Sequence, residues 1–170
     1  MKSEIIQVQD GRRVFLQTLA ELAKDDPRIC LVVPDVGFNY IQEFSDKAPG
    51  RYFNLGVTEF TSMIAVAGMA LLGLRPVIYS MVPFMTFRSH EQVRNAICLH
   101  KANVKIAGVL GGPSYKMLGM SHNLLYPTED VDTMKTLPNM EIYLPQNNEQ
   151  VKEMVIHAFS HNKPSYLRLP

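Results

Sequence analysis

Glu59 is the residue of this chain whose position most strongly suggests chemistry. It follows the run Arg51-Tyr-Phe-Asn-Leu-Gly-Val-Thr and opens the most apolar helix-like stretch of the sequence. A carboxylate that becomes buried must meet a partner or change its pKa, because an unpaired buried charge is strongly destabilising. Glu59 is therefore either a solvated residue in the first turn of a helix, where the dipole favours it, or a group held in an apolar cleft to handle a proton. The rest of the chain favours the second interpretation.

The composition is that of a globular protein. The chain has 170 residues, of which 46% are hydrophobic and 19% charged, and we expect a single domain over residues 1–170. A formal net charge of +1 leaves no basic excess for binding nucleic acid. Cys30 and Cys98 lie in apolar settings, far apart in sequence, and we expect buried free thiols in a reducing compartment.

No segment is typical of export or of membrane insertion. Residues 1–9 lack the apolar core of a signal peptide. The longest apolar run, residues 63–74, contains two glycines and is shorter than the about 20 residues that cross a bilayer. We therefore expect a cytoplasmic protein.

Helical and extended patterns alternate along the chain, which predicts an α/β protein: a three-layer parallel sheet with helices on both faces. The loop at residues 111–127 is long for a compact domain, and such loops are usually functional or mobile. In this architecture ligands gather at the carboxyl ends of the strands. Helices are predicted at residues 10–24, 58–72 (capped by Thr58 and stopped by Gly73), 89–100, 128–136 and 148–160, and strands at 29–33, 76–81, 104–110, 141–144 and 166–169.

Several short segments follow one another in an order that resembles the pyrimidine-binding domain of transketolases, which has the thiamine diphosphate-binding fold. Transketolases split into two chains resemble this sequence most, and deoxyxylulose-phosphate synthases are similar. The resemblance covers nearly the whole chain. The segments are Arg51-Tyr-Phe-Asn-Leu-Gly-Val-Thr-Glu59, Ala67-Gly68-Met-Ala70, Gly73-Leu-Arg-Pro76, Phe84, Arg88-Ser-His-Glu-Gln-Val-Arg-Asn95, Asn103-Val-Lys-Ile106, Gly119-Met-Ser-His122, Glu129-Asp130, Leu137-Pro-Asn-Met140 and Pro164-Ser-Tyr-Leu-Arg-Leu169.

The resemblance implies that the cofactor is thiamine diphosphate, and it gives Glu59 a catalytic role. In this family a glutamic acid bonds to the ring nitrogen N1′ of the aminopyrimidine and helps the cofactor's own amino group to remove the thiazolium C2 proton. The cofactor supplies the electronic chemistry, while protein groups orient and tune it. The apolar residues that follow Glu59, such as Phe60 and Met63, suit a buried carboxyl group.

The resemblance also implies cofactor-binding roles for Asp35, Phe84, Phe87 and Arg88. The family stacks aromatic rings on the pyrimidine from a Phe-x-x-Phe pattern; here Phe84 matches the second position, Met81 occupies the first, and Phe87 is a nearby replacement. The alternative is that Phe84 and Phe87 are ordinary aromatic residues of the core. Asp35 matches an aspartate near the cofactor, although a residue of a simple strand-end turn is the alternative.

Four further positions match the family on the helices and the long loop. His122 matches a histidine that faces the substrate, so we assign it a catalytic role; an exposed loop histidine without a task is the alternative. Gln92 also matches the family, and for both Gln92 and Arg88 two roles are open. They either contact the cofactor, or they anchor the helix and contact another subunit. We interpret the acidic pair Glu129-Asp130 mainly as the start of a helix.

The long loop departs from the family pattern in two ways. Sugar-transferring relatives carry an acidic pair before the Gly-x-Ser/Thr-His segment, where this chain has Met117-Leu118. Loss of that carboxylate should make the pocket more apolar and change the choice of donor. The segment between His122 and Glu129 is also longer than in these relatives, and Tyr115, Lys116 and Tyr126 lie in the altered loop.

A motif that the sequence lacks predicts a partner chain. Nothing in the sequence resembles the Gly-Asp-Gly…Asn motif that holds Mg²⁺ and the diphosphate, so the metal ligands are expected from a diphosphate-binding transketolase subunit. We expect a homodimer within a heterotetramer, with helices 58–72 and 89–100 supplying much of the contact.

The resemblance leaves the substrate open between a ketose and a 2-oxo acid. The leading hypothesis is a transketolase-like transferase that passes a ketol or acyl unit to an aldehyde. The alternatives are a β-type subunit of a 2-oxo acid dehydrogenase or decarboxylase, and a non-catalytic regulatory subunit. The presence of Glu59 argues against the last, because a regulatory relic needs no buried carboxylate.

Overall fold

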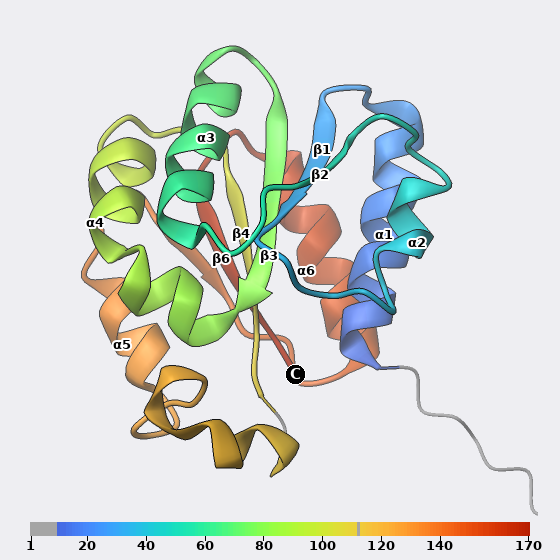
Figure 1. Ribbon diagram of the computed structural model, residues 1–170. Helices are drawn as coiled ribbons and strands as arrows, with labels where there is room; N and C mark the ends of the chain where they lie inside the picture. The colour runs from blue at the N-terminus through green and yellow to red at the C-terminus, as the bar shows by residue number, and fades with distance from the viewer. Residues whose placement is uncertain (1–9, 112) are drawn as a thin grey trace, which may run out of the picture.

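Six parallel strands form a single sheet at the centre of the protein (Figure 1). The structure is a computed structural model that describes residues 10–111 and 113–170. The order of the strands across the sheet is β2-β1-β3-β4-β6-β5, and every neighbouring pair is parallel, which confirms the predicted fold class. The strands are β1 (Ile29–Val33), β2 (Tyr52–Asn54), β3 (Arg75–Met81), β4 (Lys105–Val109), β5 (Glu141–Tyr143) and β6 (Ser165–Leu169).

The inner strands are apolar throughout because helices cover both faces of the sheet. All five residues of β1 are buried, as are all five of β4. This burial explains why the inner strands are continuous hydrophobic runs in the sequence and do not alternate. Strand β2 was not predicted, since it has only three residues, lies at the edge of the sheet and leaves Phe53 and Asn54 exposed.

One core lies on each face of the sheet. Helices α1 (Gly11–Asp25), α2 (Gln42–Ser45) and α6 (Asn148–Ser160) cover one face. Their core includes Phe15, Leu19, Phe44 and Val155. The opposite face is covered by α3 (Glu59–Leu71), α5 (Glu129–Lys135) and the helical segment between β3 and β4. That core includes Met63, Ile78, Met85 and Ile97.

Side-chain caps fix the beginning of two helices, but not of α3. Asp10 accepts the Arg12 N–H at the start of α1, and Asn147 accepts the Gln150 N–H at the start of α6. Thr58 occupies the predicted N-cap position of α3, but its side chain caps no N–H group, because its hydroxyl donates to the Leu55 carbonyl at 2.8 Å. The predicted stop at Gly73 is confirmed; its φ of +93° lies in the left-handed region that favours glycine.

The segment between β3 and β4 is not the single α-helix predicted at residues 89–100, because part of it is wound into wider π-helical turns. Two π-helical turns, η1 (Phe84–Arg88) and η2 (Val93–Cys98), flank the short α4 (His90–Gln92). Such turns are uncommon and are frequent at functional sites. The long loop that follows β4 contains 3₁₀ turns, η3 (Pro113–Ser121), with a kink at Gly119.

The acidic pair at the start of α5 does more than begin a helix. Glu129 accepts the Leu125 N–H at 2.7 Å, which is a helix-start contact. Asp130, however, is fully buried in the core, where it accepts from the Tyr166 hydroxyl at 2.6 Å and pairs with Arg168 at 3.0 Å. The interpretation of Asp130 as mainly a helix-start residue is therefore wrong, since both of its oxygens bond to residues of β6.

The two cysteines are buried free thiols, as predicted. Burial raises the pKa of each thiol to about 11, so neither is a ready nucleophile. Among the helices in the described part of the chain, none has the length and apolar character needed to cross a membrane.

Candidate active site

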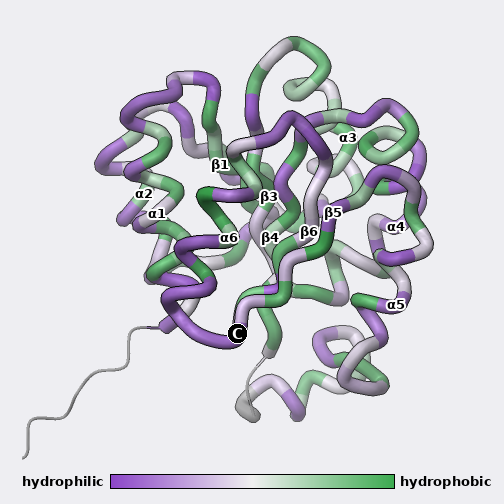
Figure 2. The backbone as a smooth tube through the Cα atoms, turned by 180° about the vertical axis from the view of Figure 1, so that it is seen from behind, coloured by the Kyte–Doolittle hydropathy of each residue, from purple (hydrophilic) through white to green (hydrophobic). Residues whose placement is uncertain are grey.

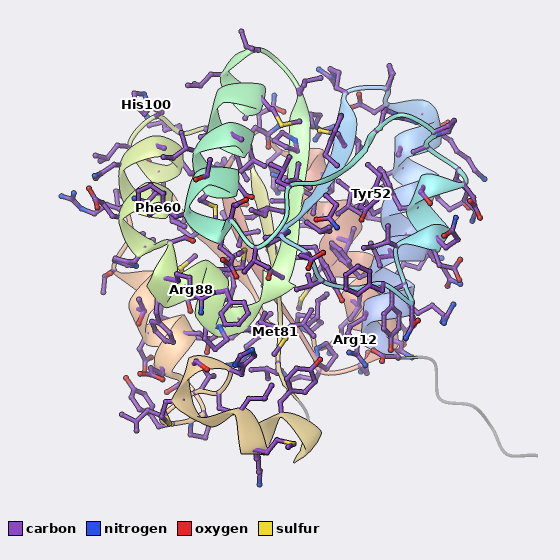
Figure 3. All side chains as sticks on the ribbon, in the orientation of Figure 1. Arg12, Tyr52, Phe60, Met81, Arg88 and His100 are labelled. Carbon is purple, nitrogen blue, oxygen red and sulfur yellow. The ribbon has the colours of Figure 1, made fainter. Side chains whose placement is uncertain are left out.

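A cleft of about 600 Å³ lies at the carboxyl ends of the strands, where ligands bind in parallel α/β sheets. Its wall includes Pro34 directly after β1, Met81 at the end of β3 and Val109 at the end of β4. We call it the strand-end cleft. In Figure 3, Met81 lies between Arg88 on one side and Arg12 on the other, and both arginines line the cleft.

Glu59 lies at one end of the strand-end cleft, in the first turn of α3, and is buried with only 4% of its surface exposed. Its Oε1 accepts a hydrogen bond from Nη1 of Arg88 at 2.8 Å. Its Oε2 has no hydrogen-bond partner in residues 10–111 and 113–170. The carboxylate is thus paired, as a buried charge must be, and still has one oxygen available to a ligand in the cleft.

An aromatic group lies beside this carboxylate. The Arg88 guanidinium stands over the Phe84 ring, 4.0 Å from its centroid, which is a cation–π contact. The imidazole of His122 packs edge-on against Phe84, with the ring centroids 4.9 Å apart. The π-helical turn η1 carries both Phe84 and Arg88, so this wide turn positions a flat ring and a cation next to Glu59.

His122 reaches the cleft from the segment that follows η3. Its Nδ1 lies 2.8 Å from the Ser121 hydroxyl, which fixes the direction of the ring. Tyr115 lies near it, with ring centroids 6.3 Å apart, and also lines the cleft. Met117 and Leu118 are exposed and lie outside the residues that line the cleft, so the apolar wall expected from them is absent in this arrangement.

Asp35 lines the cleft from the turn after β1. It adopts a left-handed conformation (φ +56°), which aspartate tolerates better than most residues. Two hydrogen bonds join it to Asn54: the Asp35 N–H donates to Asn54 Oδ1, and Asn54 Nδ2 donates to Asp35 Oδ1, both at 3.1 Å. Asp35 therefore joins the ends of β1 and β2 as well as facing the cleft.

The other end of the cleft contains residues that the sequence did not single out. Arg12 pairs with Asp10 and stacks on Tyr40, 4.6 Å from the ring centroid, while the Tyr40 hydroxyl donates to Asp10 at 2.8 Å. The hydrogen bond from Arg12, above all, lowers the pKa of Asp10 to about 2. Tyr79, from β3, also faces this end. A tyrosine within an apolar strand looks like a core residue in sequence, and only the structure places it at the cleft.

Most of the predicted site residues come together. Asp35, Glu59, Phe84, Arg88 and His122 all line the strand-end cleft. Phe87 lies outside the residues that line it and is 36% exposed, so this structure does not bring Phe87 to the site. Gln92 is buried and also lies outside the cleft wall, in keeping with a role in anchoring its helix.

The residues at the Glu59 end fit an aminopyrimidine ring. Oε2 of Glu59 can accept a hydrogen bond from a protonated ring nitrogen, and Phe84 offers a flat apolar surface beside it. Arg88 at present covers that ring face and donates to the same carboxylate. The described residues contain no group of three or more metal-ligating side chains that could hold a metal ion.

Comparison with known proteins gives a consistent family. Residues 7–170 match the family model described as the transketolase, pyrimidine binding domain. The chain is 32% identical over 159 residues to an apulose-4-phosphate transketolase subunit of Phocaeicola vulgatus, covering 93% of this chain and 50% of the relative. It is 30% identical to 1-deoxy-D-xylulose-5-phosphate synthase of Carboxydothermus hydrogenoformans, covering 92% of this chain and 25% of that protein. The chain thus spans about half the length of the relatives named as transketolase subunits.

Solved structures agree with this assignment. A chain described as a split gene transketolase, inactive beta4 tetramer, superposes with a TM-score of 0.83 at 32% identity, covering 95% of this chain and 51% of the other. The transketolase of Campylobacter jejuni shares the fold, with a TM-score of 0.78 at 20% identity, covering 96% of this chain and 26% of that one. The chain therefore belongs to the transketolase family, in which it forms the pyrimidine-binding domain.

Proposed function

We propose that this chain is the pyrimidine-binding subunit of a thiamine diphosphate-dependent, transketolase-like enzyme that transfers a ketol or acyl unit to an aldehyde. The observation that carries the proposal is the buried carboxylate of Glu59, with one oxygen free, next to the Phe84 ring in the strand-end cleft. Relatives named as transketolase subunits support the same reaction class.

Each residue at this end of the cleft has a separate task in the proposal. Glu59 holds a proton between its free oxygen and the ring nitrogen of the cofactor, and Phe84 keeps that ring flat against an apolar surface. Arg88 neutralises Glu59 while the cofactor is absent. His122, fixed by Ser121, presents an imidazole to a substrate oxygen. Thiamine diphosphate, when bound, would supply a carbon nucleophile that no side chain of the protein can provide.

The proposal requires a second chain. Mg²⁺ and the diphosphate would be held by a partner subunit, since this sequence contains no match to the Gly-Asp-Gly…Asn motif. The relative SqwH of Clostridium sp. is itself named a transketolase subunit. The chain described as an inactive beta4 tetramer supports the further idea that this type of chain assembles without its partner in an inactive form.

An exposed apolar surface on α3 supports such assembly. Phe60, Ile64, Leu71 and Leu72 are 50%, 48%, 60% and 88% exposed. The turn that follows α3 is coloured hydrophobic in Figure 2, at the top of the molecule, where it projects beyond the sheet. Clusters of exposed apolar residues of this kind mark protein–protein contacts. We therefore assign this α3 surface to the subunit interface.

The test is reconstitution of activity with the partner. The chain is co-purified from its source, and the partner is identified by mass spectrometry. The complex is then assayed with thiamine diphosphate, Mg²⁺, an aldehyde acceptor and either a ketose phosphate or pyruvate as donor. Turnover that depends on both chains and on the cofactor supports the proposal. Turnover of pyruvate but not of the ketose phosphate would favour a 2-oxo acid reaction. If turnover of either donor did not depend on thiamine diphosphate, the proposed function would be refuted.

A further inference from the structure

Two histidines at the end of α6 face each other, and the proposed reaction uses neither of them. His157 lies in the last turn of the helix, and His161 is the residue that caps its C-terminal end. Their Nε2 atoms are 3.0 Å apart, and the two ring centroids are 4.4 Å apart with an interplanar angle of 84°. Both residues lie outside those that line the strand-end cleft, so the pair is separate from the candidate active site.

The spacing of the two histidines in the sequence explains why their rings meet. Residues four apart are neighbours on the surface of a helix. The Tyr143 ring packs edge-on against His157, with centroids 5.8 Å apart, and limits how far that imidazole can turn. In a neutral pair one Nε2 carries the hydrogen and the other accepts it, so both nitrogens are directed at one point between the rings.

The distance between these nitrogens is that of two ligands on one metal ion. An imidazole nitrogen binds an ion such as Zn²⁺ at about 2.0–2.1 Å. Two such nitrogens lie about 2.9 Å apart when the angle at the metal is a right angle, and about 3.3 Å apart at the tetrahedral angle. The observed 3.0 Å is closer to the first value, which is typical of the square-planar and tetragonal complexes of Cu²⁺ and Ni²⁺.

Two side-chain contacts hold the segment of chain that carries His161. The buried Nζ of Lys105 donates to the carbonyls of His161 at 3.4 Å and of Lys163 at 2.6 Å. The side chain of Asn103 donates to that of Asn162 at 3.2 Å. Because these anchors fix the backbone on both sides of His161, a ligand that binds there has less chain to order.

The surroundings of the pair favour a positive charge. His157 lies in the last turn of α6, which is the negative end of the helix dipole. The Glu141 carboxylate interacts electrostatically with His161. Glu141 already accepts from Tyr143 and Lys163, each at 2.8 Å, so it serves as a nearby charge and not as a third ligand. This agrees with the lack of a group of three metal-ligating side chains in the described part of the chain.

We propose that His157 and His161 form a two-histidine chelate for a late first-row divalent metal ion, of the Cu²⁺ and Ni²⁺ class, with water in the remaining coordination positions. The metal ion takes the place of the hydrogen that the two Nε2 atoms share, and this hydrogen moves to Nδ1 of its own ring. Imidazole suits such ions, whereas Mg²⁺ prefers oxygen ligands. The chelate is therefore distinct from the Mg²⁺ of the proposed reaction and does not depend on that reaction.

Isothermal titration calorimetry of the full chain, prepared without a histidine tag, tests the chelate with NiCl₂ as the probe. One Ni²⁺ should bind per chain, CuCl₂ should bind more tightly, and MgCl₂ should give no heat of binding. His157→Asn and His161→Asn should each weaken Ni²⁺ binding at least about tenfold, because a single imidazole loses the advantage of two linked ligands. His100→Asn changes an exposed histidine that follows η2 and should leave the affinity unchanged.

A double variant tests the geometry of the pair and not only the number of histidines. Adding Ile156→His to His157→Asn restores the count but places the new imidazole five residues from His161, on another face of α6, so Ni²⁺ binding should stay weak. Absence of Ni²⁺ binding by the wild type, wild-type affinity in either single variant, or full recovery in the double variant would overturn the chelate. An equal loss in His100→Asn would also overturn it.

Electron paramagnetic resonance gives a second reading of the same site. One equivalent of Cu²⁺ should show two imidazole nitrogens as equatorial ligands in the wild type, and one in His157→Asn or His161→Asn. A single nitrogen in the wild type would refute the chelate. Because His157 is exposed, its replacement should leave the melting temperature of the metal-free chain unchanged, and the loss of metal binding is then not a loss of folding.

Discussion

Arg88 donates to the buried carboxylate of Glu59 across 2.8 Å while 43% of its own side chain remains exposed. The pair joins the first turn of α3 to the π-helical turn η1. The guanidinium thus makes both contacts that the proposed function assigns to the pyrimidine ring, a hydrogen bond to Glu59 and a stack on Phe84. Arg88 thus keeps the Glu59 carboxylate paired when no cofactor is bound.

Replacing Arg88 should destabilise the isolated chain. Arg88→Met leaves the Glu59 carboxylate buried without a donor, which costs about 1–3 kcal/mol in the free energy of unfolding, measured by urea denaturation. Lys163→Met is the control, because it breaks an exposed pair with Glu141 that is worth less than about 1 kcal/mol. Adding Glu59→Gln to Arg88→Met should recover most of the lost stability, and additive losses would contradict the pairing.

Changing Glu59 should strongly lower the turnover of the reconstituted complex. Glu59→Gln keeps the shape of the side chain but cannot exchange the proton, so kcat should fall at least about 100-fold, as for other general acid–base residues. Glu91→Gln, an exposed glutamate on the neighbouring α4, is the control and should leave kcat unchanged. Near-normal turnover of Glu59→Gln would remove Glu59 from catalysis.

The buried carboxylate of Asp130 should contribute strongly to stability, and the partly exposed carboxylate of Glu129 should contribute weakly. Asp130→Ala leaves the Tyr166 hydroxyl and the Arg168 guanidinium without their partner in the core, which costs about 3–5 kcal/mol. Glu129→Ala removes only one contact, to the Leu125 N–H, and should cost about 1 kcal/mol. Urea unfolding of the two adjacent variants measures the difference, and equal losses would contradict it.

Lys105 should make the stability rise with pH. Its side chain is fully buried, and desolvation, followed by the nearby Arg75, lowers its pKa to about 7. Between pH 7 and the ordinary lysine pKa of about 10.4, the unfolded chain binds a proton that the folded chain does not. Stability therefore increases with pH across this window, by at most about 1.4 kcal/mol per pH unit from this group.

Thermal unfolding at pH 6, 8 and 9.5 checks this prediction. The wild type should gain stability above pH 7, and Lys105→Met should lose that gain, since it carries no proton in either state. The test is the slope of stability against pH and not the absolute stability, because the variant also leaves the Lys163 and His161 carbonyls without their donor. Parallel pH profiles for the two proteins would refute the role of Lys105.

A charge on the α3 surface should weaken assembly. Ile64→Lys places an ammonium in the exposed apolar surface assigned to the interface, so the chain should shift to smaller species in analytical ultracentrifugation. Ile156→Lys changes an isoleucine of similar exposure on α6, beyond the other face of the sheet, and should leave the assembly intact. Equal effects of the two variants would place the interface elsewhere.

The sequence predicted the elements that leave a clear apolar run or period and missed those that leave none. The range of β1 was predicted without error, because covering on both faces makes it a continuous apolar run, and α6 was predicted equally well from its amphipathic period. Strand β2 was missed because a three-residue edge strand with two exposed residues leaves no pattern. The width of the π-helical turns was missed, since side-chain periodicity does not report a local change of pitch over five residues.

For the candidate site, the resemblance located one end of the cleft and missed the other. Glu59, Phe84 and His122 lie in matching motifs, and the structure brings them together. Tyr79 lies in a strand whose sequence indicates core, and its place in the wall of the cleft exists only in three dimensions. A position of this kind depends on which strand ends become neighbours, which no local pattern states.

The widened turns η1 and η2 make chain length critical in this part of the protein. A π-helical turn holds one more residue than an α-helical turn, so removing a single amino acid would let the backbone tighten to the ordinary pitch. Every side chain beyond the deletion would then rotate by roughly 100° about the helix axis, away from its present neighbours. We expect evolution to vary the amino-acid types in this stretch while tolerating no shortening of it.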